Sequence, residues 1–127
     1  MIQRQDLKLD NWCYGSVRQN EPMQIKSLDQ TICKLGEYLE DYGFVRGIPL
    51  TPEILSKVGC KEMDNGYWLP VTNLKGELHF ETFKSTDEIV STLHAPFCEL
   101  ILDRIYFLHQ LQNIFYWFTK TELPYTP

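Results

Sequence analysis

The sequence predicts a small α+β domain with its strands gathered in the N-terminal part and its longest helix near the C-terminus. Short extended segments follow one another at roughly ten-residue spacing between residues 11 and 50, separated by Gly, Pro and Asn turns. A helix pattern opened by proline begins at Thr51, and a long segment near the C-terminus repeats its apolar residues with helical periodicity. The 127 residues, 43% of them hydrophobic, are expected to form a single globular domain.

The N-terminal half, residues 7–50, is expected to form a small antiparallel sheet that curls into a barrel of the SH3-like kind. Extended segments are predicted at residues 11–17, 23–28, 31–35 and 42–50. The acidic stretch between the last two segments is compatible with either a strand or a turn. Short strands separated by glycine and proline turns are typical of small barrels and curled sheets.

A short helix is predicted from Thr51 to Gly59, at the start of the second half, residues 51–127. The Thr51 hydroxyl can accept a hydrogen bond from a backbone amide of the first turn, and Pro52 suits the first helical position. Gly59 can adopt the left-handed conformation that ends many helices. Both ends of this helix are therefore marked by local signals.

The segment between this helix and the C-terminal helix is expected to be mixed. Residues 67–71 and 77–84 are predicted to form a hairpin, with Pro70 at a sheet edge or at a strand end. Residues 85–93 are predicted to be a short helix, and residues 98–102 a short strand that leads into the C-terminal helix.

The C-terminal helix is expected to be amphipathic and to pack on the sheet. Its apolar residues fall in one arc of a helical wheel: Phe107, Leu108, Leu111, Ile114, Phe115 and Phe118. We expect the helix to run from Asp103, as its N-cap, to Lys120, because Pro124 disfavours a helical conformation at Leu123. A longer helix that begins near Pro96 is the alternative.

The opposite face of this helix carries a second stripe, formed by Tyr106, Gln110, Asn113 and Trp117. A solvent-exposed helix face usually carries lysine and glutamate, whereas tyrosine and tryptophan are enriched where proteins meet their partners. Two interpretations are open. Another part of the chain covers this face, with the amides bonded to loop backbone, or the face binds a partner.

The charge balance disfavours polyanionic partners. The chain has 17 acidic and 12 basic residues, a net charge of −5, and no run of basic residues. Duplex DNA and anionic membranes reward clustered lysine and arginine, so neither nucleic acid nor a membrane is the expected partner.

The N-terminal residues and the cysteines indicate a cytoplasmic protein. Residues 1–10 contain no apolar segment of the kind found in signal peptides. The four cysteines, Cys13, Cys33, Cys60 and Cys98, are widely spaced and form no C-x-x-C pair, which is poor evidence for zinc. We expect reduced, buried thiols and no cofactor.

One constellation could carry chemistry. Glu77, His79 and Glu81 would share a face if residues 77–84 form a strand. Two carboxylates beside an imidazole can bind a metal or perform acid–base catalysis, but a solvated polar strand face predicts the same alternation. The chain contains no phosphate-binding loop, no G-x-S-x-G and no H-E-x-x-H motif, and we assign no catalytic residue.

Three stretches of the chain form a recognisable series: LKLDNW at 7–12, IPLTPEILSKVG at 48–59 and YFLHQLQNIFYWFTKTEL at 106–123. The series resembles a family of small uncharacterised proteins from Bacteroides-type gut bacteria and their phages or prophages. The resemblance implies this order of elements and a bacterial or phage origin, and it implies no activity. Lys120 stands where the family has a glycine that looks like a left-handed helix cap, so the helix must end differently here or continue.

These observations favour a non-enzymatic accessory protein that binds another macromolecule, either a protein partner or a second copy of itself. A first alternative is a nucleic-acid-binding barrel. The bases of the nucleic acid would stack on Trp12, Tyr14 and Tyr42, and its phosphates would contact Arg18, Lys26, Lys34 and Arg46. A second alternative is a metal-assisted enzyme at Glu77, His79 and Glu81.

Overall fold

The computed structural model describes residue 2 and residues 4–18, 20–63, 66–71, 76–83, 88–95 and 98–127. For residues 63, 76–77, 81–83, 88–95 and 98–104 it describes the backbone alone. The chain divides into two compact units. Unit 1 comprises residues 1–49, 107–113 and 127, and unit 2 comprises residues 50–106 and 114–126. Antiparallel sheets and helices occur together, so the predicted α+β class is confirmed.

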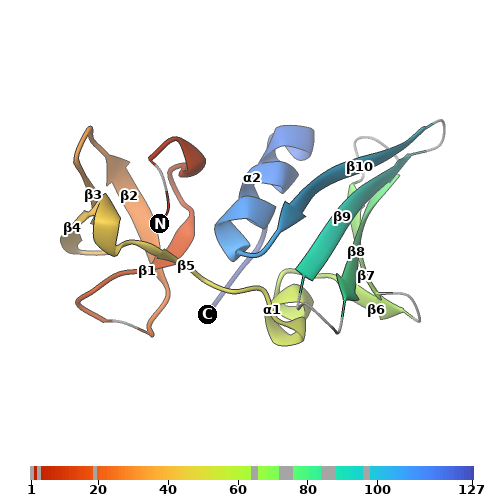
Figure 1. Cartoon of the computed structure of the whole chain (residues 1–127), viewed down its shortest axis with the longest axis horizontal. Coiled ribbons are helices and arrows are strands. Elements are labelled where there is room, and N and C mark those ends of the chain that lie inside the picture. Colours follow the sequence, from red (N-terminus) through yellow and green to blue (C-terminus); the bar gives the residue numbers. More distant parts are fainter. Residues whose placement is uncertain are drawn as a thin grey trace. The chain divides into compact units, whose positions relative to one another are not determined.

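Unit 1 contains a five-stranded antiparallel sheet in the order β4-β3-β2-β1-β5 (Figure 1). Its strands are β1 (Trp12–Tyr14), β2 (Met23–Leu28), β3 (Ile32–Leu35), β4 (Tyr38–Asp41) and β5 (Arg46–Gly47). The 3-10 turn η1 (Arg4–Asp6) precedes β1, and η2 (Tyr42–Phe44) connects β4 to β5. The acidic stretch that the sequence left ambiguous is therefore β4, and most of the predicted segment 42–50 is turn and loop. The strand order is that of an open sheet, compatible with a barrel-like half.

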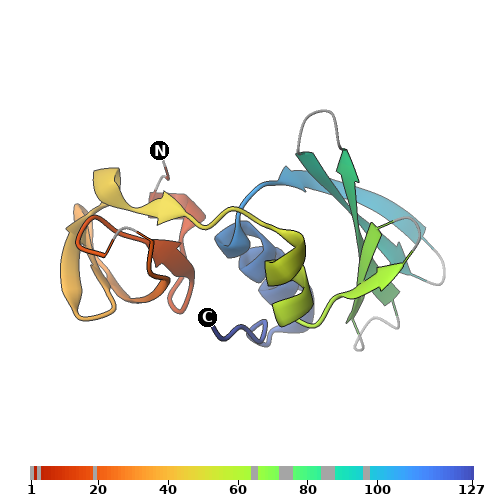
Figure 2. The ribbon, with the colours of Figure 1, turned by 90° about the horizontal axis from the view of Figure 1, so that it is seen from below.

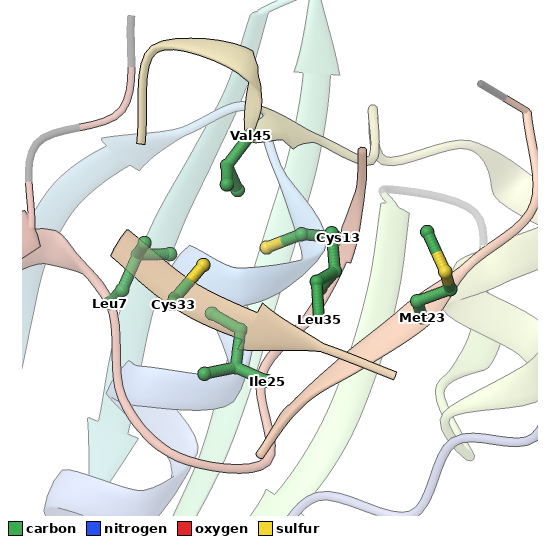
Figure 3. Close-up of a cluster of buried hydrophobic side chains, with 7 residues drawn as sticks. All are labelled: Leu7, Cys13, Met23, Ile25, Cys33, Leu35 and Val45. Atoms are coloured by element: carbon green, nitrogen blue, oxygen red, sulfur yellow. The ribbon is translucent and has the colours of Figure 1, made fainter. Parts of the chain in front are cut away.

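The core of unit 1 lies on one face of this sheet. Figure 3 shows its seven side chains: Leu7, Cys13, Met23, Ile25, Cys33, Leu35 and Val45. The members from β1, β2 and β3 alternate with more exposed residues, as the two-residue period of a strand requires. Burying each of the larger side chains contributes about 1.5–3 kcal/mol.

Unit 2 begins with the predicted short helix, α1 (Pro52–Lys57). The Thr51 hydroxyl accepts a hydrogen bond from Ile54 N–H at 3.2 Å, and Gly59 follows the helix with a φ of 99°. Leu55 is completely buried. The cap, the proline and the glycine thus act as the sequence predicts.

A five-stranded antiparallel meander follows, in the order β10-β9-β8-β7-β6. Its strands are β6 (Lys61–Met63), β7 (Gly66–Val71), β8 (Gly76–Phe83), β9 (Glu88–Ala95) and β10 (Cys98–Ile105). Figure 2 shows how their directions change across the sheet, as expected for a twisted sheet. The predicted hairpin is confirmed as β7–β8. Pro70 lies opposite Glu77 of β8 and two residues beyond Trp68, the last residue of β7 that pairs with β6, so β7 is an edge strand at this point.

The segment 85–93 was predicted to be a helix, and this prediction is wrong. The structure has β9 from Glu88 to Ala95, between β8 and β10, while residues 84–87 lie outside the described part. The β-branched residues Ile89, Val90 and Thr92 fit a pleated strand better than a helix. Two neighbouring strands override a short apolar pattern that is ambiguous by itself.

Both predicted starts of the C-terminal helix are also wrong, because α2 extends from Leu108 to Thr119. Asp103 lies in β10, so it is not the N-cap. The pairing of β10 with β9 shifts register between Ile101 and Arg104, and this irregularity interrupts the alternation that would mark the strand in the sequence. Leu108 and Leu111 are completely buried.

Candidate functional site

Two polar segments from opposite ends of the chain meet in unit 1. Asn11 is completely buried, and its Nδ2 atom donates to Asn113 Oδ1 at 2.9 Å. Asn11 Oδ1 accepts from Lys8 N–H at 2.8 Å, and Asn113 Nδ2 donates to the Asp6 carbonyl at 2.9 Å. The two amides therefore connect α2 to the segment before β1 by a continuous chain of hydrogen bonds.

Gln112 takes the place of a neighbouring strand beside β1. Its side chain is buried, with 1% of the residue exposed. Its Oε1 atom accepts from Trp12 N–H at 2.9 Å, and its Nε2 atom donates to the Asp10 carbonyl at 3.3 Å. Strand β5 pairs with β1 at Cys13 and Tyr14, and the glutamine amide extends this pairing by one step. A buried N–H left without its acceptor would cost about 1–3 kcal/mol.

Gln110 closes the start of α2. Its Oε1 atom accepts from Phe107 N–H at 3.0 Å, the bond that a glutamine in the first turn makes in a capping box. Leu108 N–H donates to the Ile48 carbonyl at 2.8 Å. The Phe107 ring lies so close to Gly47 that a Cβ atom there would be 2.5 Å from Phe107 Cγ. The helix start thus depends on distant residues as well as on its own first turn.

His109 is a buried imidazole in the same region. It is 2% exposed, and its ring stacks on Phe107 with 5.8 Å between the ring centroids. Burial lowers the pKa of His109 to about 4, although the Asp6 carboxylate acts in the opposite direction. Its Nδ1 atom is buried without a hydrogen-bond partner among the described residues. The ring is neutral at pH 7 and contributes packing to the start of α2.

The second half of α2, in unit 2, ends in exposed aromatic side chains. Trp117 is 72% exposed, and Tyr116 is 36% exposed. Lys120 Nζ lies 5.4 Å from the Trp117 ring centroid and 6.0 Å from that of Tyr116. An ammonium group over exposed rings contributes about 0.5–1 kcal/mol by cation–π attraction. We call Tyr116, Trp117 and Lys120 the aromatic end of α2.

Lys120 also ends the helix. Its φ is 58°, in the left-handed region, and its N–H donates to the Tyr116 carbonyl at 2.8 Å. The Thr119 hydroxyl donates to the Phe115 carbonyl at 2.8 Å and accepts from Thr121 N–H at 3.1 Å. The helix therefore ends at a lysine in the left-handed conformation, which glycine adopts most readily.

The four residues of the predicted interaction stripe serve different purposes. Gln110 and Asn113 belong to unit 1, are half-buried, and bond to the backbone of their own chain. Tyr106 and Trp117 belong to unit 2 and are exposed. Tyr106 lies before the start of α2 and is therefore not on the helix as predicted; its carbonyl accepts from Leu50 N–H at 2.9 Å, and the residue is 42% exposed. Of the four side chains, the two aromatic rings remain accessible to a partner.

The candidate metal site on β8 is described for one side chain, His79. It is buried and stacks on its cross-strand neighbour Trp68, with 4.0 Å between ring centroids and 11° between ring planes. The side chains of Glu77 and Glu81 lie outside the described part of the structure. Among the side chains that are described, no three potential ligands gather at one point.

The described cysteines have the protonation state of structural thiols. Burial raises the pKa of Cys13 and of Cys60 to about 12, and it also raises the pKa of Cys33. All three are free and buried. A nucleophilic cysteine requires the opposite shift, because the thiolate is the reactive form.

Most of the residues proposed to contact nucleic acid lie in the strands of unit 1. Arg18 is paired with Glu21, with 3.0 Å between Nη1 and Oε2. Tyr42 packs partly against the core, and its hydroxyl donates to the Asp29 carbonyl. Arg18 and Tyr42 are therefore not counted among the candidate nucleic-acid contacts. The other five belong to β1, β2, β3 and β5: Trp12, Tyr14, Lys26, Lys34 and Arg46.

Comparison with known proteins gives no match: no family model, no curated protein and no solved structure is significantly similar to the chain. Within the described residues, neither α1 nor α2 has the length and apolar character needed to cross a bilayer.

Two features of these surfaces were not predicted from the sequence. The hydrogen bond from Asn11 to Asn113 joins residues 102 positions apart and has no local signal in the sequence. Lys120 was not grouped with the two aromatic residues Tyr116 and Trp117. Its one-turn spacing from both, at the end of a helix pattern, could have revealed it.

Proposed function

We propose that the protein is a non-enzymatic accessory protein that binds another protein through the aromatic end of α2. The observation that carries this proposal is the exposure of Trp117, 72%, on a helix whose other end is fastened by buried hydrogen bonds. A tryptophan exposed on a rigid helix loses little conformational freedom when it enters a pocket. Such residues are over-represented among those that dominate binding energy.

The charges around this surface favour a protein partner. The segment 106–127 contains one basic residue, Lys120, and one acidic residue, Glu122. Protein interface cores are depleted of charge and enriched in tyrosine and tryptophan, whereas surfaces that bind nucleic acid need several cations. We expect the partner to offer an apolar pocket for Trp117 and a carboxylate within reach of the Lys120 ammonium.

Two further features support an accessory role. The sheet of unit 1 has five short strands and a 3-10 turn before the last one, which fits an SH3-like small barrel, a fold that hosts many binding functions. The series of motifs at residues 7–12, 48–59 and 106–123 resembles proteins of gut bacteria and their phages, which is the origin we infer.

The test is co-purification followed by a binary binding measurement. Tagged wild-type protein and the Trp117→Ala variant are used to capture partners from the lysate of the source organism. The captured protein is identified and purified, and its Kd is measured by titration calorimetry. Truncation of a dominant interface residue costs at least about 2 kcal/mol, so Trp117→Ala should weaken binding by about 30-fold or more.

Phe44→Ala is the matched control, because Phe44 is an aromatic residue that is 60% exposed in unit 1. It should leave the Kd within about twofold, since it removes exposed apolar area at another place. Light scattering of the purified protein separates self-association from binding to a different chain. Equal affinities of the wild type and Trp117→Ala for the purified partner would contradict the proposal.

A further inference from the structure

The strands of unit 1 carry a charge pattern that differs from that of the whole chain. The net charge of −5 arises largely outside residues 1–49, which contain six basic and seven acidic residues. Within β1, β2, β3 and β5 there are three cations and no acidic residue at all. The acidic residues of this unit lie in η1, in its loops and in β4, where Asp41 is opposite Ile32 and therefore diagonal to Lys34. The three cations lie on β2, β3 and β5, and none of these strands contains an acidic residue of its own.

Strand pairing places these cations on one face together with two aromatic residues. Tyr14 lies opposite Arg46, and the Arg46 guanidinium carbon is 5.4 Å from the Tyr14 ring centroid. Trp12 lies opposite Gln24 on the other side of β1. Residues directly opposite each other in an antiparallel pair point to the same face, and residues two apart on a strand do so as well. Trp12, Tyr14 and Arg46 thus share a face.

The two lysines extend this face across β2 and β3. Lys26 Nζ donates to Gln24 Oε1 at 3.0 Å, which keeps the ammonium beside Gln24, the residue opposite Trp12. Lys26 lies where the β2–β3 register shifts, and the next residue, Ser27, is opposite Lys34. Lys26, Lys34 and Arg46 are all exposed, and the two aromatic residues are half-buried.

This face is distinct from the one that holds the core. Cys13, between Trp12 and Tyr14, points into the cluster of Figure 3 and is completely buried. Gly47 lies opposite Cys13, and the direction in which its Cβ would point is occupied by the Phe107 ring. The helix start therefore covers the side of β5 to which Cys13 points, and the Tyr14–Arg46 pair lies on the other side.

We propose that this outer face, formed by Trp12, Tyr14, Lys26, Lys34 and Arg46, binds single-stranded nucleic acid. Its three cations are placed to contact phosphates, and its two aromatic side chains provide surfaces on which bases can stack. Aromatic rings between cations are the combination that sequence-tolerant binding of single strands requires. A duplex keeps its bases stacked inside and would use the cations alone.

The site goes beyond the proposed protein interaction, because it lies in unit 1 and uses none of the residues of the aromatic end of α2. Three phosphate contacts predict a modest affinity with a shallow salt dependence. The slope of log K against log salt for a single strand is about −0.7 per contact, so a slope of about −2 is expected.

The test is a fluorescence-anisotropy titration of a labelled oligothymidylate of about 20 nucleotides, a length above the footprint of one small barrel. The whole protein is titrated between about 20 mM and 200 mM salt, the range in which counterion release is measured. The double variant Lys26→Gln/Lys34→Gln should weaken binding more than about tenfold at the lowest salt and reduce the slope to about −0.7. Tyr14→Ala should weaken binding at least about fivefold.

Three controls decide the outcome. Lys120→Gln and Trp117→Ala, both in unit 2, should leave the affinity for the oligonucleotide unchanged, which separates this site from the proposed protein interface. Lys34→Arg should retain binding, because the charge is kept. Absence of binding at the lowest salt, an unchanged affinity of the double lysine variant, or equal binding of a duplex of the same length would each overturn the proposal.

Discussion

In the first half of α2, the side-chain amides of Gln110, Gln112 and Asn113 bond to backbone groups of the same chain. In the second half, Trp117 lies at the surface beside Tyr116, with the Lys120 ammonium near both rings. One uninterrupted helix therefore has an end that serves the fold and an end that is available to a partner. Polar atoms with specific backbone partners mark the structural half, and exposed aromatic area marks the half available to a partner.

The largest loss of stability should come from substituting a core residue in the first half of α2. Leu111 is completely buried, so Leu111→Ala should lower the free energy of unfolding by about 2–5 kcal/mol through lost burial and the cavity left behind. Urea unfolding followed by circular dichroism measures the change. Leu39→Ala is the matched control, because Leu39 is 71% exposed and should change stability by less than about 0.5 kcal/mol. Equal losses would contradict the burial described for α2.

A lower pH should reduce the stability of the protein through His109, which lies in the first half of α2. The pKa of His109 is about 4 in the folded protein, below the value of about 6.5 expected in the unfolded chain. The unfolded chain therefore binds the proton first, and stability that is fully present above pH 6.5 is lost as the pH falls towards 4. The shift corresponds to about 3 kcal/mol. Urea unfolding at several pH values between 7.5 and 4 measures this loss.

The variant His109→Phe isolates the contribution of the imidazole from that of the carboxylates, which also titrate in this range. The difference in stability between the wild type and the variant should narrow, or reverse in favour of phenylalanine, as the pH falls. A difference that stays constant with pH would show that His109 does not carry the acid sensitivity.

Loss of the Gln112 hydrogen bonds should have the next largest effect on stability. Gln112→Ala leaves Trp12 N–H without its acceptor and should destabilise the protein by about 1–3 kcal/mol. Amide hydrogen exchange at Trp12 should accelerate in the variant, a readout that a general packing defect elsewhere would not single out. Gln30→Ala, at an exposed position, is the control and should leave both measurements unchanged. Unchanged exchange at Trp12 in the glutamine variant would argue against this hydrogen bond.

A substitution at the C-terminal end of α2 should have a smaller effect on the free energy of unfolding, and it should stabilise the protein. Lys120 adopts a φ of 58°, a conformation that costs an ordinary residue about 1 kcal/mol and glycine almost nothing. Lys120→Gly should therefore raise the free energy of unfolding by up to about 1 kcal/mol, less the lost cation–π contact. Lys120→Ala removes the same contact without relieving the backbone, and it should be less stable than the glycine variant. The reverse order would contradict the left-handed helix end.

Local signals account for the parts of the fold that the sequence predicts well. Thr51, Pro52 and Gly59 mark α1 within a few residues, and the alternation from Met23 to Leu28 marks β2 with its observed bounds. The start of α2 could not be found in this way, because Leu108 N–H is satisfied by the Ile48 carbonyl, about sixty residues away in the chain. Strand β9 was missed because its pairing partners, rather than its own period, determine its conformation.

The candidate surfaces were predictable to a similar extent. Trp117 and Tyr106 could be recognised as unusual on a helix face, and their exposure is now seen directly. The division of the stripe could not be foreseen, because whether an amide such as Asn113 is available depends on Asn11 and Asp6 at the other end of the chain. The separation of Trp12 and Tyr14 from the core follows from strand register, which the sequence alone left open.

The most direct test of the central claim, that the aromatic end of α2 is not needed for folding, is a parallel urea titration of Trp117→Ala and Gln112→Ala. Trp117→Ala should lower the free energy of unfolding by no more than about 1 kcal/mol, the upper value for its exposed cation–π contact with Lys120. Gln112→Ala should lose about 1–3 kcal/mol in the same experiment. If Trp117→Ala is destabilised as strongly as Gln112→Ala, then Trp117 belongs to the core, and its proposed role in binding a partner is wrong.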